Sequence, residues 1–394
     1  MLEIIGKYAN VKVMIDEVDS ATLSQIYTIS SSPVAENTNI VIMPDTHAGA
    51  GCVIGFTQKL DNNNPRIVPN LLGVDISCTI SSYNLGHIKN IDFEDFDKFI
   101  RANIPLGAGS YLANRNKKLD NKYLTKDVCR LFEETNNLIK EDGCEGYSMK
   151  VSIYNQLLSI GSGNHFIELG KDEQDNYWLS VHCGSRNLGL TVCNIYMKHA
   201  DQYRLDHKIK TERDLSYLEK DSIYYDRYIN CVRGCQLFAE INHKMIADTI
   251  ISNYFNQHLE NIEDKIITKH NYLDIDNMII RKGAISAYKD QMVVIPFNMR
   301  DGIAICKGKG NIDWNESAPH GAGRIMSRGE AKRELNLDNV KQDMKNHGVF
   351  TTSLDYALDE APGAYKDTEL IKQCIKPTVD IVHMIKPLYN VKGK

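Results

Sequence analysis

A carboxylate and a thiol stand three residues apart at Asp75 and Cys78, directly after a Pro-Asn turn. A hard oxygen and a soft sulfur on one turn can bind a borderline divalent cation, and a thiolate can bridge two such cations. A structural Asp turn beside a buried cysteine is the commoner explanation for such a pair taken alone. The pair supports a metal-site hypothesis because histidine-bearing segments follow it along the chain.

Two of these histidines lie in glycine-bearing segments. His165 stands in the stretch GSGNHFIE, where small residues let the backbone approach a ligand and where an amide, an imidazole and a carboxylate are available. His182 stands in VHCGSR, at the end of an apolar run, before a turn whose amides and Arg186 suit a phosphate. One isolated histidine would be interpreted as a hydrogen-bonded core residue. Two histidines in such turns favour a functional site that includes both of them.

The other histidines differ in their surroundings. His270 is predicted to cap a short strand within residues 266–274 and is a third imidazole ligand candidate, although no glycine stands beside it. Four more lie in helical patterns without a glycine turn, and we interpret them as surface or core residues: His199, His207, His243 and His258.

His320 stands in SAPHGAGRIMSR, flanked by a proline and two glycines. The pattern predicts that His320 is exposed at the start of a helix, with Arg324 and Arg328 one turn apart. Helix N-terminal amides and two arginines would form a cradle for a polyphosphate. A neutral imidazole there could attack an activated phosphate. Together with a one- or two-metal site, this combination indicates phosphoryl or nucleotidyl transfer.

Further polar segments are weaker signals. The loop 359–367, DEAPGAYKD, carries Tyr365, which could stack on a base, and Lys392 offers a last cation near the C-terminus. The basic stretches 281–283 and 307–311 could bind phosphate as turns between strands, but ordinary hairpin chemistry is the preferred interpretation for each.

The elements that must position these residues follow from the hydrophobic pattern. A buried strand at 39–43 is predicted to end at Pro44 and to lead through a polar loop into a second strand at 53–56. Further strands are predicted at 79–85, 177–181 and 266–274, and helices at 93–102, 126–140, 189–203 and 218–254. Thr125 is the predicted N-cap of the second helix, and the last helix is either continuous or broken at Gly234.

The composition, with 42% hydrophobic and 25% charged residues among 394, is typical of a soluble globular protein. The lack of an internal repeat or of a linker rich in proline, glycine or serine predicts one catalytic domain over residues 1–394. A net charge of -5 indicates that any nucleic acid would be held by a local basic patch. Ten cysteines without paired spacing, no charged-then-apolar N-terminal signal and no apolar run of ~20 residues predict a reduced, cytoplasmic protein with no membrane span.

Nine blocks, read in order, together resemble the RtcB family of RNA ligases: PDTHAGAG, GVDISC, GSGNHFIE, VHCGSR, HNY, GKGN, SAPHGAGRIMSR, DEAPGAYKD and a final KG. The resemblance implies an RtcB-like α+β fold, with mixed β-sheets flanked by helices around a central metal and nucleotide pocket. It also implies a GTP- and Mn²⁺-dependent enzyme. Such an enzyme joins RNA ends bearing a 2′,3′-cyclic phosphate or 3′-phosphate to 5′-hydroxyl ends, in RNA repair or tRNA splicing.

Residue by residue, the resemblance implies that Cys78 bridges two Mn²⁺ ions and that His320 forms a covalent bond to GMP. It assigns the other metal ligands in two pairs, one for each ion: Asp75 with His165, and His182 with His270. The positions that match the nucleotide pocket are Asn164, Glu168, Arg324, Tyr365 and Lys392. Asp45 and His47 match supporting positions.

The chain departs from the family pattern near its motifs. Ser77 and the pair Thr79-Ile80 replace glycine-rich neighbours of the metal motif, and residues 295–301 replace a small-residue turn beside the nucleotide. Two alternatives therefore accompany the ligase hypothesis. One is a metal-dependent RNA-end phosphatase or cyclic phosphodiesterase without guanylylation, and the other is a non-enzymatic RNA-end binding protein.

Overall fold

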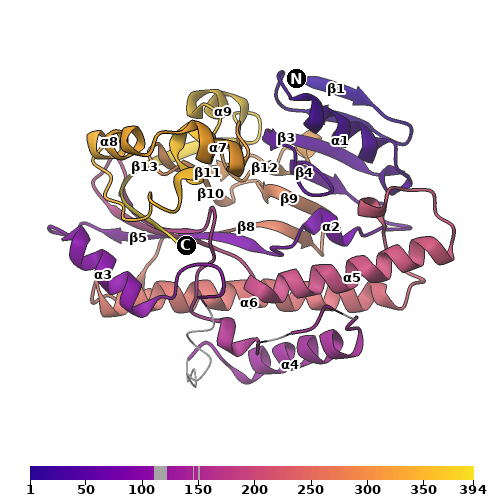
Figure 1. The fold of residues 1–394 in the computed structure, drawn as a ribbon, viewed down its shortest axis with the longest axis horizontal. Helices are drawn as coiled ribbons and strands as arrows, with labels where there is room; N and C mark the ends of the chain where they lie inside the picture. Colours follow the sequence, from indigo (N-terminus) through magenta and orange to yellow (C-terminus); the bar gives the residue numbers. More distant parts are fainter. Residues whose placement is uncertain (111–121, 145, 150) are drawn as a thin grey trace.

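The fold is organised around one long, mostly antiparallel sheet (Figure 1). The structure is a computed structural model, and it describes residues 1–110, 122–144, 146–149 and 151–394. Within these residues, the twelve strands of the main path are, in spatial order, β1 (Leu2–Ile5), β2 (Asn10–Val13), β3 (Asn39–His47), β4 (Ile54–Lys59), β9 (Ile279–Ser286), β8 (Lys265–Asp274), β5 (Cys78–Gly86), β7 (Tyr177–Cys183), β6 (Phe166–Lys171), β13 (Val379–Lys392), β11 (Gly302–Gly308) and β10 (Met292–Asn298). The short strand β12 (Ser317–Pro319) pairs with β9.

Both faces of the central strands are covered. Every residue of β7 and of β9 is buried, so these two strands expose neither face to solvent. The sheet also curls, so that β10 packs on β8, and the backbone N–H of Val294 donates a hydrogen bond to Thr268 Oγ1 at 2.9 Å. This curl brings the end of β10 to the same cavity as the ends of β5 and β7.

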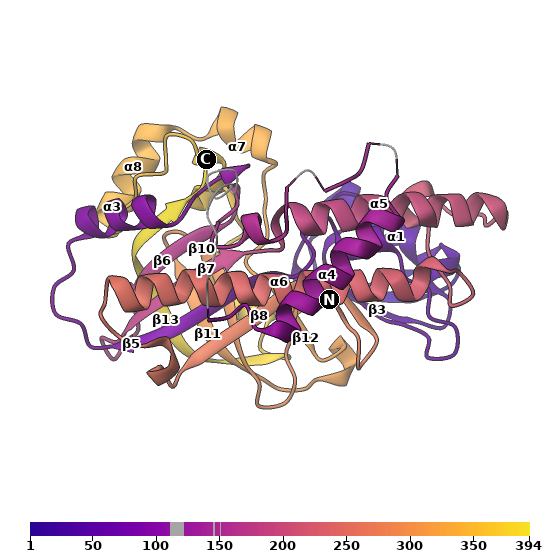
Figure 2. The ribbon, with the colours of Figure 1, turned by 90° about the horizontal axis from the view of Figure 1, so that it is seen from below.

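The helices α5 (Arg186–Asp206) and α6 (Tyr224–Asn253) lie along one face of the sheet, and α4 (Lys126–Glu141) packs on their outer side (Figures 1 and 2). Thr125 accepts a hydrogen bond from the N–H of Val128, which confirms the predicted N-cap. The helix α6 is continuous through Gly234, and the glycine at this position allows the close contact with α4. A Cβ atom at Gly234 would lie 2.1 Å from Thr135 Oγ1.

The remaining helices lie at the edges and on the opposite face. The helix α1 (Ser20–Ser30) packs against β1, β2 and β3, whereas α2 (Pro69–Leu72) contacts α5, β8 and β9. The helix α3 (Phe93–Asn103) lies beyond β5. On the other face are α7 (Arg328–Glu334), α8 (Leu337–Asn346) and α9 (Thr368–Cys374) (Figure 1). The predicted α+β fold is confirmed. In the described part of the chain, no helix is both long and apolar enough to cross a membrane.

Three local predictions are wrong. The first strand does not end at Pro44 but continues to His47. Its pairing with β4 is irregular between Ile42 and His47, and this irregularity accommodates a residue that has no N–H to donate. His270 lies within β8 and not at its cap. Residues 281–283 lie inside β9 and form no turn, and the Arg281 side chain is fully buried.

The predicted helix start at His320 is also wrong. His320 follows β12, and α7 begins only at Arg328, where Ser327 and Glu330 form a capping box. The local signal for a helix start is therefore the Ser-x-x-Glu pattern and not the proline that precedes His320. The His320 side chain is 17% exposed, so it is partly buried and not at an open helix end.

Candidate active site

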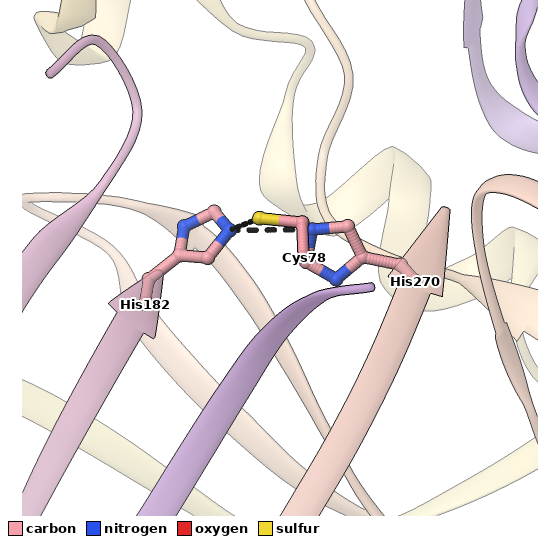
Figure 3. A group of neighbouring side chains, drawn as sticks. All are labelled: Cys78, His182 and His270. Carbon is pink, nitrogen blue, oxygen red and sulfur yellow. Dashed lines mark hydrogen bonds between the residues drawn. The ribbon is translucent and has the colours of Figure 1, made fainter. Parts of the chain in front are cut away.

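Three neighbouring strands bring one thiol and two imidazoles together. Cys78 begins β5 and lies directly opposite His270 of β8, while His182 is near the end of β7 on the other side of β5. The Nε2 atom of His182 lies 3.2 Å from Cys78 Sγ and 3.2 Å from His270 Nε2 (Figure 3). The sheet register therefore builds one group of three candidate metal ligands.

A second group shares the same thiol. Asp75 precedes β5 and His165 precedes β6, and Nε2 of His165 lies 3.0 Å from Asp75 Oδ2 and 3.3 Å from Cys78 Sγ. Cys78 thus belongs to two groups of three, Asp75–Cys78–His165 and Cys78–His182–His270. This arrangement brings together all five residues that the sequence suggested as metal ligands.

The surroundings of these side chains fit a divalent cation. The backbone carbonyl of Asn164 lies 3.1 Å from Nδ1 of His182, and this contact orients Nε2 toward the thiol. Burial lowers the pKa of His182 and of His270 well below the usual range, so both rings are neutral at pH 7 and carry a free lone pair. A thiolate, imidazoles and a carboxylate suit a borderline transition metal.

The pKa values of the Cys78 thiol and the Asp75 carboxyl are shifted in opposite directions. Burial and the nearby Asp75 carboxylate raise the pKa of Cys78 well above the usual value for a thiol. Burial by itself would raise the pKa of Asp75, but the hydrogen bond and charge of His165 outweigh it and lower that pKa overall. A bound cation would favour the thiolate, because metal ligation deprotonates cysteine.

His320 lies beside these groups. Its ring centroid is 4.9 Å from that of His270. The fully buried carboxylate of Asp45 accepts a hydrogen bond from His320 Nδ1 at 2.7 Å and another from the His320 backbone N–H at 3.2 Å. His47 Nδ1 in turn lies 3.0 Å from the Asp45 carbonyl. The extended β3 strand therefore carries the residue that orients His320.

One cavity of about 390 Å³ is lined both by the metal-ligand candidates and by His320. Ten of the eleven site residues suggested by the sequence line it, and the exception, His165, is reached through Asp75 and Cys78. Within the cavity, burial raises the pKa of Glu168 to about 7. Burial has the opposite effect on a cation and lowers the pKa of Lys392. The Lys392 ammonium lies 5.2 Å from the centre of the Phe166 ring.

The arginines reach the cavity without the expected helix. Arg324 lies 5.3 Å over the ring of Tyr365 and donates a hydrogen bond to the carbonyl of Asp359 at 2.7 Å. Arg328 pairs with Asp359 at 2.8 Å and with Glu360. The predicted cradle of helix amides is absent at His320, because α7 begins eight residues later. Both guanidinium groups nevertheless contact the wall that carries Tyr365.

The structure adds residues that the sequence did not single out for this site. Asn390 lines the cavity and donates a hydrogen bond to Glu168 Oε2 at 2.7 Å. Its position two residues before Lys392 in a strand was the only available signal, since such residues share a face. Lys366 donates to the carbonyls of Pro44 and Thr46 and so holds the segment around Asp45.

The departures from the family pattern lie close to the cavity. Ser77 has a φ of 59°, in the left-handed region where glycine is favoured, which explains the glycine in the usual pattern. In the substituted stretch 295–301, four residues line the cavity: Pro296, Phe297, Asn298 and Met299. The metal-ligand candidates and His320 are retained in the sequence, and they lie together at one site despite these changes.

A partly buried imidazole beside two candidate metal groups in one cavity defines the class, an α+β enzyme with a candidate metal centre. The tRNA-splicing ligase RtcB family model matches residues 25–393, and the chain belongs to this family of RNA ligases. The RNA-splicing ligase RtcB of Escherichia coli is 28% identical over 396 residues, covering 90% of each chain. The tRNA-splicing ligases RtcB of Nanoarchaeum equitans and Thermococcus kodakarensis are each 26% identical, covering 98% of this chain and 94% of theirs.

Proposed function

We propose that the chain is a GTP- and Mn²⁺-dependent RNA ligase that works through a covalent His320–GMP intermediate. It joins RNA ends bearing a 2′,3′-cyclic phosphate or 3′-phosphate to 5′-hydroxyl ends, in RNA repair or tRNA splicing. The observation that carries the proposal is the sharing of Cys78 between two ligand groups beside His320. Residues 1–394 would act as one cytoplasmic catalytic domain, with RNA and GTP as its partners.

The Asp75–Cys78–His165 and Cys78–His182–His270 groups would hold one cation each. Such cations would neutralise the triphosphate charge and orient its leaving group. The Asp45 carboxylate keeps the proton of His320 on Nδ1, so that the Nε2 lone pair can attack the α-phosphate of GTP. The Nε2–P bond forms as the bond from phosphorus to pyrophosphate breaks.

The later steps transfer the guanylate to RNA. An RNA 3′-phosphate oxygen would attack the phosphorus of the His320–GMP adduct, and the imidazole would leave. The RNA 5′-hydroxyl would then attack the activated 3′-phosphate and release GMP. A 2′,3′-cyclic phosphate would first be opened by water to a 3′-phosphate. Asn164, Glu168, Arg324, Tyr365 and Lys392 would bind the nucleotide, since all five line the same cavity.

The proposal is tested with GTP labelled at the α-phosphate, Mn²⁺ and a matched pair of RNA ends. We expect an acid-labile protein adduct and a joined RNA, and loss of both in His320→Ala. The control is His207→Ala, because His207 lies at the exposed end of α5. RNA-end hydrolysis that persists in His320→Ala would instead indicate a metal-dependent phosphatase or cyclic phosphodiesterase. Binding without joining or hydrolysis would indicate a non-enzymatic RNA-end binding protein.

A further inference from the structure

Two neighbouring side chains that line the cavity, Asn390 and Glu168, each keep one buried acceptor atom without a hydrogen-bond donor among the described residues. Asn390 of β13 is directly opposite Glu168 of β6 in the antiparallel register, so both side chains are on one face of the sheet. Each residue is 2% exposed. The amide group of Asn390 donates to Glu168 Oε2, and among the described residues neither Asn390 Oδ1 nor Glu168 Oε1 has a hydrogen-bond partner.

Such an arrangement is unusual for an interior. Buried polar atoms are normally paired, and leaving one unpaired costs about 1–3 kcal/mol. In its carboxylate form Glu168 can only accept, so the Asn390 amide group must face it and Asn390 Oδ1 must remain an acceptor. Both residues line the cavity that also contains His320. The pair is therefore prepared for a ligand that presents two hydrogen-bond donors side by side.

We propose that Asn390 is a specificity-determining residue that accepts a hydrogen bond from the 2-amino group of a guanine base, beside Glu168, which is already assigned to the nucleotide and would accept from N1–H. This inference rests on the proposed nucleotide-dependent function of the site. Guanine presents the two donors on one edge. Inosine retains N1–H but lacks the 2-amino group, and adenine presents an unprotonated N1 there. Asn390 would therefore separate GTP from ITP, while Glu168 would separate both from ATP.

The ribose offers the other source of two adjacent donors, its 2′- and 3′-hydroxyl groups. If Asn390 contacted the ribose, its replacement would change the discrimination between GTP and 2′-deoxy-GTP and not that between GTP and ITP. The test therefore measures binding of GTP, ITP, ATP and 2′-deoxy-GTP by calorimetry, in the full chain with Mn²⁺. Adduct formation from each nucleotide is measured in parallel.

For the unsubstituted protein we expect GTP to bind about tenfold more tightly than ITP, the usual effect of leaving one buried polar group unpaired. In Asn390→Val this ratio should fall to about one, while the preference for both over ATP remains. Valine suits a buried strand position. Gln58→Leu is the control, because Gln58 is a buried strand amide on β4 that does not line the cavity.

The outcomes separate this inference from the proposed function. Equal binding of GTP and ITP by the unsubstituted protein, with normal adduct formation, would overturn the role of Asn390 and leave the ligase proposal standing. An unchanged GTP-to-ITP ratio in Asn390→Val would also overturn it, as would a change confined to 2′-deoxy-GTP. Selective GTP binding that depends on Asn390, without any adduct, would support the inference and contradict the transfer mechanism.

Discussion

The Oδ2 atom of Asp45 lies 2.7 Å from Nδ1 of His320, with a residue separation of 275 along the chain. The carboxylate is fully buried, whereas the imidazole is 17% exposed in the cavity. The contact selects the tautomer with the proton on Nδ1 and leaves Nε2 with its lone pair. One residue of β3 thus determines which nitrogen of His320 is available to react.

Asp45→Asn should therefore slow adduct formation. Asparagine can donate to Nδ1 and stabilise the wrong tautomer, and a comparable replacement in serine proteases lowers the rate by about 10⁴. We expect a loss of at least about a hundredfold in the rate of adduct formation, measured with labelled GTP. Metal content and melting temperature should stay close to those of the unsubstituted protein. A rate within a factor of two would contradict the assigned role of Asp45.

The two ligand groups should lose metal separately. His165→Ala removes a ligand of the group with Asp75, and His182→Ala removes one of the group with His270. We expect each variant to keep one tightly bound cation per chain. Cys78→Ser should weaken both sites by more than about a hundredfold, because even residues that only support metal ligands are worth 10–100-fold. Metal content after dialysis, measured by mass spectrometry, checks the stoichiometry.

Cys183→Ser is the matched control for Cys78→Ser. Cys183 is equally buried and lies near the same strands, but it belongs to neither ligand group. Its Sγ contacts the carbonyl of Ser159, a contact that a hydroxyl can keep. Equal metal loss in both serine variants would show that the effect comes from disturbed packing and not from loss of a shared ligand.

The raised pKa of Glu168 predicts that the stability of the folded protein depends on pH. Burial raises its pKa from 4.5 to about 7, so the folded protein favours the protonated acid. The contribution of this group to stability is complete below pH 4.5 and is lost as the pH rises through 7. Relative to Glu168→Gln, the metal-free protein should lose at most about 3 kcal/mol between pH 4.5 and pH 8. Urea unfolding of both proteins at the two pH values measures the difference, and a constant difference would contradict the raised pKa.

Gly234→Ala should destabilise the helical layer. The added Cβ would lie 2.1 Å from Thr135 Oγ1, so α4 and α6 would have to separate. Overpacking of this kind costs about 1–3 kcal/mol, which urea unfolding can measure. Gly329→Ala is the control, since Gly329 is exposed in α7 and its nearest neighbour is the flexible end of Arg333 at 3.5 Å. Equal stability of both variants would contradict the tight contact.

Local signals in the sequence were sufficient for much of the scaffold. The N-cap Thr125 and the helical spacing after it predicted α4, and similar patterns predicted α3 and the long α6. The same signals failed at Pro44, where the sheet tolerates a missing donor through irregular pairing. They failed again at His320, where short strand pairing with β9 replaces the expected helix start. In both places, contacts with distant strands outweigh the local preference.

By itself, the sequence determined which chemical groups are available: a thiol, a carboxylate, imidazoles and cavity-lining polar residues in short glycine-bearing motifs. Residue types and spacing left the grouping of the ligands open, the family resemblance implied one, and the tertiary structure supplies the contacts that form it. The register of β5 with β7 and β8 joins Cys78 to His182 and His270, and the pairing of β6 with β13 places Asn390 against Glu168. Strand register depends on burial and pairing along whole strands, so such contacts between distant residues cannot be deduced from the motifs themselves.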